Sequence, residues 1–400
     1  MSLMNSVKNE VKLLAYIGSY PNTLTNPDIT EELFTEERNS IFKAMQMSYG
    51  EHGAITPETI EQYYKGSQAD LMNAPIVQVI EPLIADLQRL LKKRKLKEIA
   101  EFALDAANQD NPNLLEVQEM LLGVEESTTD STLTVASMKF MKTLRAKRSK
   151  SYHFISTGIP ILDVAMGGEW PRGNVSLIVA DPGGSKTSLV CNSSLRMAFQ
   201  DNASLFLSLE MGKQELISRW AADYCSIDNA DIISGNITEE QEQEIQAASN
   251  LFDKLPMYTV DKDGLSILDM VPIIRSHVRD KGVKVVFIDH LQRIKTGENR
   301  NVELGLIAKI LRSLAKKLDI HICIISQKNS KDGVWSVRDS GNVPADVDII
   351  LNISFTDESS GDIRSATFEF TKFRNGRTGK YPTLFNGPFL RYGKAIQENE

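Results

Sequence analysis

At roughly 100–200 residues per domain, the 400 residues of this chain allow two to four domains. With 42% hydrophobic and 24% charged residues, the composition is that of an ordinary folded protein and excludes a disordered chain. No stretch approaches the roughly 18 uninterrupted apolar residues of a membrane helix, and the N-terminal segment has too short an apolar run for a signal peptide. We therefore predict an intracellular protein, located in the cytoplasm.

The charge balance argues against one class of function. The chain carries 45 basic and 53 acidic residues, a formal net charge of −8, which disfavours a protein that coats nucleic acid by bulk attraction. Local basic surfaces stay open, because residues 139–150 and 364–394 are both rich in Lys and Arg. From the sequence alone, each tract suits either a solvated face or a binding surface.

The cysteines give no sign of a disulfide framework or a metal site. Cys191, Cys225 and Cys323 are scattered and have apolar neighbours. They lack CxxC spacing and nearby histidine clusters, and an odd number does not suit a set of paired bridges. We predict that all three are buried structural thiols.

Residues 1–107 have the pattern of a small helical domain. Apolar side chains recur near helical spacing through residues 34–49, and Thr56 with Pro57 forms the start signal of a further helix, Thr56 being the N-cap. A long amphipathic stretch covers residues 76–107. Because the region lacks strand signals and chemical motifs, we predict an all-helical interaction domain.

Residues 108–154 differ from the regions on either side. The segment 108–113, rich in Asn and containing a proline, breaks the preceding helix, and residues 125–134 are rich in Ser, Thr and acidic residues. Apolar residues in the basic tract 139–150 lie near helical spacing. We predict a linker that contains a short basic helix, which docks on a neighbouring surface.

From residue 155 to residue 400 the pattern changes to short apolar runs that alternate with helical stretches. Runs rich in Val, Ile and Leu, most of them followed by a helix, are typical of a buried parallel sheet in an α/β domain. Two later segments alternate like antiparallel edge strands. The predicted strands are residues 175–180, 204–209, 283–288, 320–326, 349–353, 365–371 and 383–391.

A phosphate-binding loop is predicted directly after the first of these strands. A glycine-containing loop, the pair Lys186-Thr187 and a helical run follow the strand, so that backbone N–H groups and the helix N-terminus can cradle phosphate. Lys186 is expected to reach the outer phosphates of a nucleotide, and Thr187 to ligate Mg²⁺. The candidate nucleotide-binding residues are Asp181, Pro182, Gly183, Gly184, Ser185, Lys186, Thr187 and Ser188.

The loop departs from the pattern GxxxxGK[ST] at two positions. Ala180 stands where the first glycine belongs, and Ser185 replaces the glycine before the lysine. The turn must therefore use Gly183, Gly184 and a non-glycine residue with a positive φ. A strand-to-helix turn with an incidental lysine is the alternative interpretation, and reduced nucleotide turnover stays open.

Polar side chains follow three of the predicted strands. Glu210, Asp289 and Gln327 each occur where an apolar run ends, and α/β sheets hold their ligands at the carboxyl ends of strands. We predict that Asp289 binds Mg²⁺ through water and that Glu210 is the base that orients the attacking water. Gln327 is predicted to sense the γ-phosphate and to signal its loss through a moving loop at residues 328–337. Each residue alone also suits a strand cap, but the three together favour a nucleotide site.

Taken in order, these motifs resemble those of the DnaB-type replicative helicases, which are hexameric ATPases with a RecA-like core. The resemblance covers residues 155–393 and rests on the phosphate loop, SLEM, IDHLQ, VRDSG and KFRNGRTG, with a weaker similarity over residues 26–60. It implies an α/β fold with a RecA-like P-loop ATPase core, a small all-helical N-terminal domain, and ATP with Mg²⁺ as cofactors. Because typical cellular members are longer, a phage or plasmid version is expected.

The resemblance also implies roles for residues that spacing does not explain. Lys372 and Arg374 match the basic pair that in this family reaches across a subunit interface into the ATP site of the neighbouring subunit. Arg338, Asp339 and Gly341 match the loop that contacts the phosphates of single-stranded DNA in the central channel. For the residues of the phosphate site, the implied roles agree with those predicted above.

The sequence therefore predicts an ATP-dependent DNA helicase that forms a homohexameric ring on single-stranded DNA and unwinds duplex DNA. The resemblance alone implies 5′–3′ polarity and, as partners, a primase and a helicase loader; no membrane partner is expected. Two alternatives stay open: a RecA-like recombination or repair ATPase that forms filaments, and a non-catalytic DNA-binding or helicase-regulating protein that kept the fold. Micrographs of rings or filaments and a DNA-stimulated ATPase assay would separate them.

Overall fold

The chain forms two compact units, Met1–Tyr152 and His153–Glu400. The finer division predicted above, into residues 1–107, 108–154 and 155–400, stays a prediction. The structure, a computed structural model, describes residues 3–26, 28–66, 74–75, 77, 79–108, 116–117, 120–121, 133–149, 152–181, 183, 185–296, 300–331, 334–337, 343–360 and 362–393.

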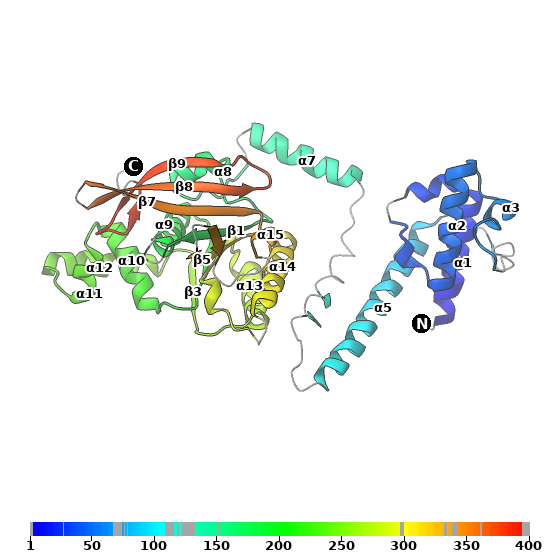
Figure 1. The fold of residues 1–400 in the computed structure, drawn as a ribbon, viewed down its shortest axis with the longest axis horizontal. Helices are drawn as coiled ribbons and strands as arrows, with labels where there is room; N and C mark the ends of the chain where they lie inside the picture. Colours follow the sequence, from blue (N-terminus) through cyan, green and yellow to red (C-terminus); the bar gives the residue numbers. More distant parts are fainter. Residues whose placement is uncertain are drawn as a thin grey trace. The chain divides into compact units, whose positions relative to one another are not determined.

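The described part of the N-terminal unit is helical, as predicted (Figure 1). Its core brings together side chains such as Leu13 and Ile17 from α1 (Leu3–Ser19), Phe42 from α2 (Glu36–His52) and Leu87 from α5 (Glu81–Ala107). Its helices are α1 (Leu3–Ser19), η1 (Pro21–Thr25), η2 (Glu31–Leu33), α2 (Glu36–His52), α3 (Pro57–Ile60), α5 (Glu81–Ala107) and α7 (Leu133–Arg148).

Two local predictions for this unit are confirmed. The backbone N–H of Thr59 donates to the Thr56 hydroxyl, and Pro57 occupies the first helical position, so Thr56 is the N-cap of α3. Residues 139–148 of the basic tract lie in α7, as predicted, and Phe140 and Leu144 of this helix are exposed. The predicted docking of this helix on a neighbouring surface stays a prediction.

The C-terminal unit is built on one twisted sheet. The strands lie in the order β10-β9-β8-β7-β1-β5-β4-β2-β3, with parallel pairing from β7 to β3 and antiparallel pairing from β7 to β10 (Figure 1). They are β1 (Val175–Ala180), β2 (Ser204–Ser208), β3 (Met257–Asp261), β4 (Val285–Asp289), β5 (His321–Lys331), β6 (Val334–Val337), β7 (Ile349–Ser360), β8 (Ile363–Phe373), β9 (Gly379–Asn386) and β10 (Arg391–Tyr392).

Helices separate the parallel strands along the chain, which is the arrangement that parallel pairing requires. Every residue of β1, β2 and β4 is buried, which explains why their sequences are continuous apolar runs. The helices are α8 (Pro160–Met166), α9 (Lys186–Phe199), α10 (Lys213–Cys225), α11 (Asn229–Ser234), α12 (Glu239–Phe252), α13 (Ile267–Lys281), η3 (Leu291–Arg293), α14 (Arg300–Leu318) and α15 (Val343–Asp346).

The structure corrects the sequence prediction in three places. Strand β3 was not predicted, because it lies at the edge of the parallel region and its half-exposed residues do not form an apolar run. The segment 328–337 was predicted as a loop, and this was wrong: β5 continues to Lys331 and pairs with β6 as an antiparallel hairpin. The predicted strand 383–391 is divided between β9 and β10, with a turn between them.

The predicted state of the cysteines is confirmed. Cys191, Cys225 and Cys323 are free and buried. Burial raises the pKa of Cys225 and of Cys323 to about 12, so both stay protonated thiols near neutral pH.

The described part of the chain contains no helix that is both long enough and apolar enough to span a membrane.

Candidate nucleotide-binding site

The predicted phosphate loop connects β1 to α9. Strand β1 ends at Ala180 and helix α9 begins at Lys186. Gly183 has a φ of 71°, and Ser185, the residue before the helix, has a φ of 53°. The expectation that a non-glycine residue adopts a positive φ is therefore confirmed at Ser185. Pro182 and Gly184 lie outside the described residues.

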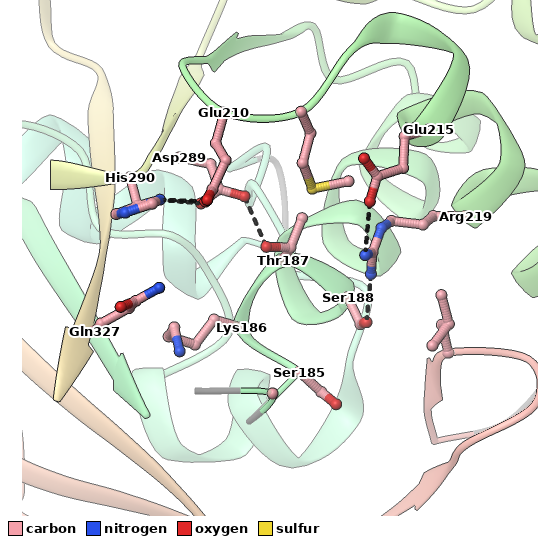
Figure 2. Close-up of a pocket in the computed structure, with 13 residues that line it drawn as sticks. Ser185, Lys186, Thr187, Ser188, Glu210, Glu215, Arg219, Asp289, His290 and Gln327 are labelled. Carbon is pink, nitrogen blue, oxygen red and sulfur yellow. Dashed lines mark hydrogen bonds and ion pairs between the residues drawn. The ribbon is translucent and has the colours of Figure 1, made fainter. Parts of the chain in front are cut away.

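A cavity of about 500 Å³ lies at the N-terminus of α9 (Figure 2). It brings together most of the described residues that the sequence assigned to nucleotide and magnesium binding, and it adds others. Among the described residues, the lining consists of Gly183, Ser185, Lys186, Thr187, Ser188, Glu210, Met211, Glu215, Arg219, Asp289, His290, Gln327 and Leu390.

Lys186 lies nearly buried at the start of the helix. Its Nζ donates to the carbonyl oxygens of Ala180 and Asp181, at 3.0 and 2.9 Å. Burial lowers the pKa of Lys186, while the carboxylates of Asp289, Asp181 and Glu210 act in the opposite direction. An anion beside Nζ would further favour the charged ammonium group. The position therefore suits a lysine that neutralises phosphate.

Thr187 and Asp289 form a pair of oxygen groups within the cavity. The Thr187 hydroxyl donates to Oδ2 of Asp289 at 2.7 Å, and burial raises the pKa of Asp289. A buried carboxylate is costly unless a proton or a cation neutralises it. Hydroxyl and carboxylate oxygens also suit Mg²⁺, which typically takes few protein ligands and shares substrate phosphates. The oxygen pair therefore has the donor chemistry that suits a magnesium ion shared with a nucleotide.

Glu210 follows β2 and points into the same cavity (Figure 2). One carboxylate oxygen, Oε2, lies 2.8 Å from Nδ1 of His290, and the other, Oε1, accepts from Arg293 at 3.1 Å. Sequence reasoning missed both partners. They meet Glu210 because β2 pairs with β4, with Ser208 opposite Asp289, so the residues that follow the two strands face one another.

Gln327 lines the cavity, but its place in the strand differs from the prediction. It was expected at the end of a strand, whereas β5 continues to Lys331 and Gln327 pairs with Ala180 in mid-strand. The Gln292 amide Nε2 donates to the hydroxyl of Ser326 at 2.8 Å, and the Gln327 N–H donates to Oε1 of Gln292 at 3.4 Å. Gln292, which sequence reasoning did not single out, thus connects the segment after β4 to the strand that carries Gln327.

Helix α10 contributes two charged residues that the sequence did not identify. Arg219 donates to the Ser188 hydroxyl at 3.4 Å through one guanidinium nitrogen and to Glu215 at 3.2 Å through another. No predicted strand end or glycine-containing loop marks either residue, so the sequence contains no local signal for a place in the site. Their presence in the cavity follows from the packing of α10 beside α9.

Lys372 and Arg374 lie away from this cavity. Lys372 donates to the carbonyl oxygens of Pro344 and Ala345 at 2.8 and 2.9 Å, and Nε of Arg374 lies 3.6 Å from a carboxylate oxygen of Asp348. Lys372 pairs with the start of β7, which runs parallel to β1. Both basic residues therefore lie near the N-terminal end of β1, whereas the phosphate loop follows its C-terminal end.

The predicted DNA-contacting residues Arg338, Asp339 and Gly341 lie outside the described residues. Asp181 is described and adjoins the phosphate loop, where its backbone carbonyl accepts from Lys186, but it is not among the described residues that line the cavity. The structure thus brings together the predicted catalytic glutamate, the lysine, the Thr187–Asp289 pair and Gln327, and it separates Lys372 and Arg374 from them.

The first strand of the parallel sheet leads through the predicted phosphate loop into a helix, a glutamate follows β2, and an aspartate ends the neighbouring strand β4. This is the arrangement of a P-loop core of the RecA-like class. A family model described as the DnaB-like helicase C terminal domain matches residues 155–394. The chain belongs to this family.

Known relatives of the chain agree with this assignment. The chain is 28% identical over 264 residues to the replicative DNA helicase DnaB of Pasteurella multocida, covering 62% of this chain and 56% of the relative. It is 30% identical over 214 residues to a probable plasmid replicative DNA helicase of Chlamydia muridarum, covering 51% and 47%. The chain thus aligns with about half the length of both relatives.

The fold as a whole also has a counterpart of known structure. A solved structure described as a DnaB-like replicative helicase and its interactions with primase matches with a TM-score of 0.60 and 22% identity. The match covers 96% of this chain and 98% of the other. It confirms the predicted fold class, an α/β core of the RecA-like type with a helical N-terminal region.

Proposed function

We propose that this protein is an ATP-dependent DNA helicase that assembles into a homohexameric ring around single-stranded DNA and unwinds duplex DNA. The observation that supports it is the convergence of Lys186, Thr187, Asp289 and Glu210 on one cavity, in a chain of the DnaB-like helicase family. The proposal includes ATP as substrate and Mg²⁺ as cofactor, because the oxygen pair and the buried lysine fit a magnesium-bound triphosphate.

Each side chain has a distinct task in this proposal. Lys186 binds the outer phosphates, while Thr187 and Asp289 would hold the magnesium ion, directly or through water. When bound, Mg²⁺ neutralises charge on the phosphate oxygens. Glu210 accepts a proton from the attacking water, and Gln327, beside the end of β1, hydrogen-bonds the γ-phosphate.

Glu210→Gln is expected to lower kcat for ATP hydrolysis by about 100-fold, the usual scale for loss of a general base, while ATP still binds. The amide keeps the shape of the side chain but cannot accept the proton. Steady-state hydrolysis and equilibrium binding of ATP measure the two effects. Glu215→Gln is the matched control, because Glu215 lines the same cavity but forms a partly exposed ion pair with Arg219. Its loss should change kcat by less than about fivefold, and unchanged turnover in Glu210→Gln would assign the role of base elsewhere.

The proposed assembly gives Lys372 and Arg374 a role at the interface. The nucleotide cavity of the same subunit lies at the other end of the parallel strands, so the site that they would complete belongs to a neighbouring subunit.

The proposal also covers partners and location. Single-stranded DNA is the proposed ligand of the channel, and a primase and a loader are further proposed partners. The cytoplasm of a bacterium or of a phage-infected cell is the proposed location. The identity shared with a plasmid helicase supports a plasmid or phage member of the family.

Arg338→Ala is expected to weaken binding of single-stranded DNA about equally for all base sequences. If the side chain contacts one phosphate, the slope of log K against log salt concentration should decrease in magnitude by about 0.7 unit, the value for a single strand. Fluorescence titrations of oligonucleotides at several salt concentrations measure this slope. An altered base preference with an unchanged slope would contradict a phosphate contact at Arg338.

The proposed function as a whole is tested by measuring ATP hydrolysis with and without single-stranded DNA, together with unwinding of a forked duplex. We expect hydrolysis that DNA stimulates, unwinding that requires ATP, and closed rings in electron micrographs. Filaments without unwinding would favour the recombination ATPase. Binding to DNA without any hydrolysis would favour the non-catalytic protein.

A further inference from the structure

The turn between β9 and β10 brings one apolar side chain to the nucleotide cavity. We refer to residues 387–390 as the C-terminal turn. Leu390, its last residue, lines the cavity and has a φ of 50°. A non-glycine residue of this size rarely adopts the left-handed region unless its surroundings hold it there. The backbone of Leu390 is therefore constrained by the contacts that surround it.

Asn192 of α9 supplies two such contacts, one at Leu390 itself and one just after it in the chain. Its amide Nδ2 donates to the Leu390 carbonyl at 3.2 Å, and its Oδ1 accepts from the Tyr392 N–H at 2.8 Å. Asn192 lies six residues after Lys186 in the same helix, about 9 Å along its axis at 1.5 Å per residue. One rigid helix thus carries both the phosphate-binding lysine and the side chain that holds the C-terminal turn.

A buried charge network fixes the next residue of the chain. Nε of Arg391 donates to the fully buried carboxylate of Asp223 at 2.7 Å, and Arg196 of α9 donates to the same carboxylate at 2.6 Å. Asn192 also donates to it, at 2.9 Å. Removal of one member of such a network leaves a buried charge without its partner. The C-terminal turn is thus anchored to α9 and α10 and is not a free surface loop.

The polar groups of the cavity are distributed unevenly. Figure 2 shows Glu210, His290 and Gln327 on one side of the start of α9, and Ser188, Glu215 and Arg219 on the other. In the proposed function the first side faces the γ-phosphate, because it carries the base and the glutamine. The sugar and base of the nucleotide then extend toward the second side.

We propose that Leu390 is the apolar wall against which the nucleoside of the bound nucleotide packs, and that Asn192 is a positioning residue that holds this wall in register with the phosphate loop. This inference rests on the proposed function, because it requires the phosphates to lie at Lys186. The Leu390 side chain has no hydrogen-bonding group, so it contacts the nucleoside through its surface and not through the polar edge of the base.

Inorganic tripolyphosphate separates this wall from the phosphate loop, because it carries the phosphates of ATP without a nucleoside. We would measure the Kd of ATP and of tripolyphosphate, both with Mg²⁺, for the full-length wild-type protein, Leu390→Asn and Asn192→Ala. Asparagine tolerates the left-handed backbone, so Leu390→Asn removes the apolar wall without new strain. Ser194→Ala is the control: Ser194 is a buried α9 residue whose hydroxyl accepts from the indole of Trp220 and donates to the Cys191 carbonyl.

Leu390→Asn is expected to raise the Kd and the KM of ATP about tenfold, the scale of losing one apolar side-chain contact, and to leave the Kd of tripolyphosphate within twofold. Asn192→Ala should shift the ATP values in the same direction, again with tripolyphosphate unaffected, and kcat should fall by less than KM rises. Ser194→Ala should show no such difference between the two ligands.

Two results would overturn the inference while leaving the proposed function intact. One is an unchanged ATP Kd in Leu390→Asn, and the other is an equal rise for ATP and tripolyphosphate, which would mean that the turn supports the phosphate loop or the fold. If Asn192→Ala does not fold, Leu390→Asn decides alone, because Leu390 is only partly buried. A wild-type protein that binds neither ligand would remove the proposed function and the inference together.

Discussion

Lys186→Ala is expected to reduce ATP hydrolysis by at least roughly a thousandfold, the upper range for removal of one preorganised electrostatic donor. The ammonium group is the positive charge that the phosphate loop itself brings to the cavity, where burial strengthens its interaction with phosphate. The fold should persist, because α9 is held by fully buried residues such as Leu189 and Leu195. Steady-state hydrolysis and circular dichroism measure the two expectations.

Lys213→Ala is a suitable control for this variant. Lys213 begins α10 and is exposed, and it is not among the described residues that line the cavity. Its removal changes the net charge by the same amount and should leave hydrolysis near the wild-type rate. If Lys186→Ala instead turned over ATP at a nearly normal rate, the loop between β1 and α9 would not be a phosphate loop.

The strand and the backbone turn of the predicted phosphate loop could be predicted because their signals are local. Strand β1 has the predicted bounds, since six consecutive apolar or small residues are all buried. Ser185 could be identified as a left-handed residue, because a loop that lacks a glycine before the lysine still has to make the same turn. Apolar runs, glycines and the residues between them are sufficient for this part of the argument.

The partners of Glu210 could not be predicted in the same way. His290 and Arg293 contact it only because β2 and β4 are neighbours in the sheet, and strand order depends on the packing of the whole unit. The hairpin of β5 and β6 was missed for a related reason. Its strands are stabilised by pairing with each other, and the segment lacks the continuous apolar run that identifies a central strand.

Arg374→Ala is expected to lower ATP hydrolysis by about a thousandfold or more, the scale of an arginine that stabilises the charge on the transferred phosphoryl group. A guanidinium group has a planar set of donors and stays charged near neutral pH. In this chain Arg374 follows β8 in an exposed turn, and its contact with Asp348 is partly exposed. Asp348 keeps a second cation, because a guanidinium nitrogen of Arg312 lies 2.9 Å from its carboxylate, so movement of Arg374 toward a neighbouring subunit leaves this buried carboxylate paired.

Arg377→Ala is the matched control, because Arg377 lies in the same turn and is exposed. It should hydrolyse ATP at close to the wild-type rate, which would exclude a general effect of losing positive charge from the turn. Full activity of Arg374→Ala would remove Arg374 from the mechanism. It would also weaken the inference that a closed ring is the active form.

Mixing two inactive variants tests whether Arg374 acts on a neighbouring subunit. Lys186→Ala lacks the phosphate-binding lysine, and Arg374→Ala lacks the proposed finger, so each protein alone should be inactive. In a mixed ring, a site whose lysine comes from an Arg374→Ala subunit and whose arginine comes from a Lys186→Ala subunit is intact, while other sites lack one group or both. We therefore expect mixing to recover part of the ATPase activity. Lys186 and Arg374 of one subunit lie at opposite ends of the parallel strands, so the arginine of an active site has to come from the neighbour. If exchange of subunits is verified and no mixing ratio recovers activity, an arginine supplied by the neighbour is contradicted.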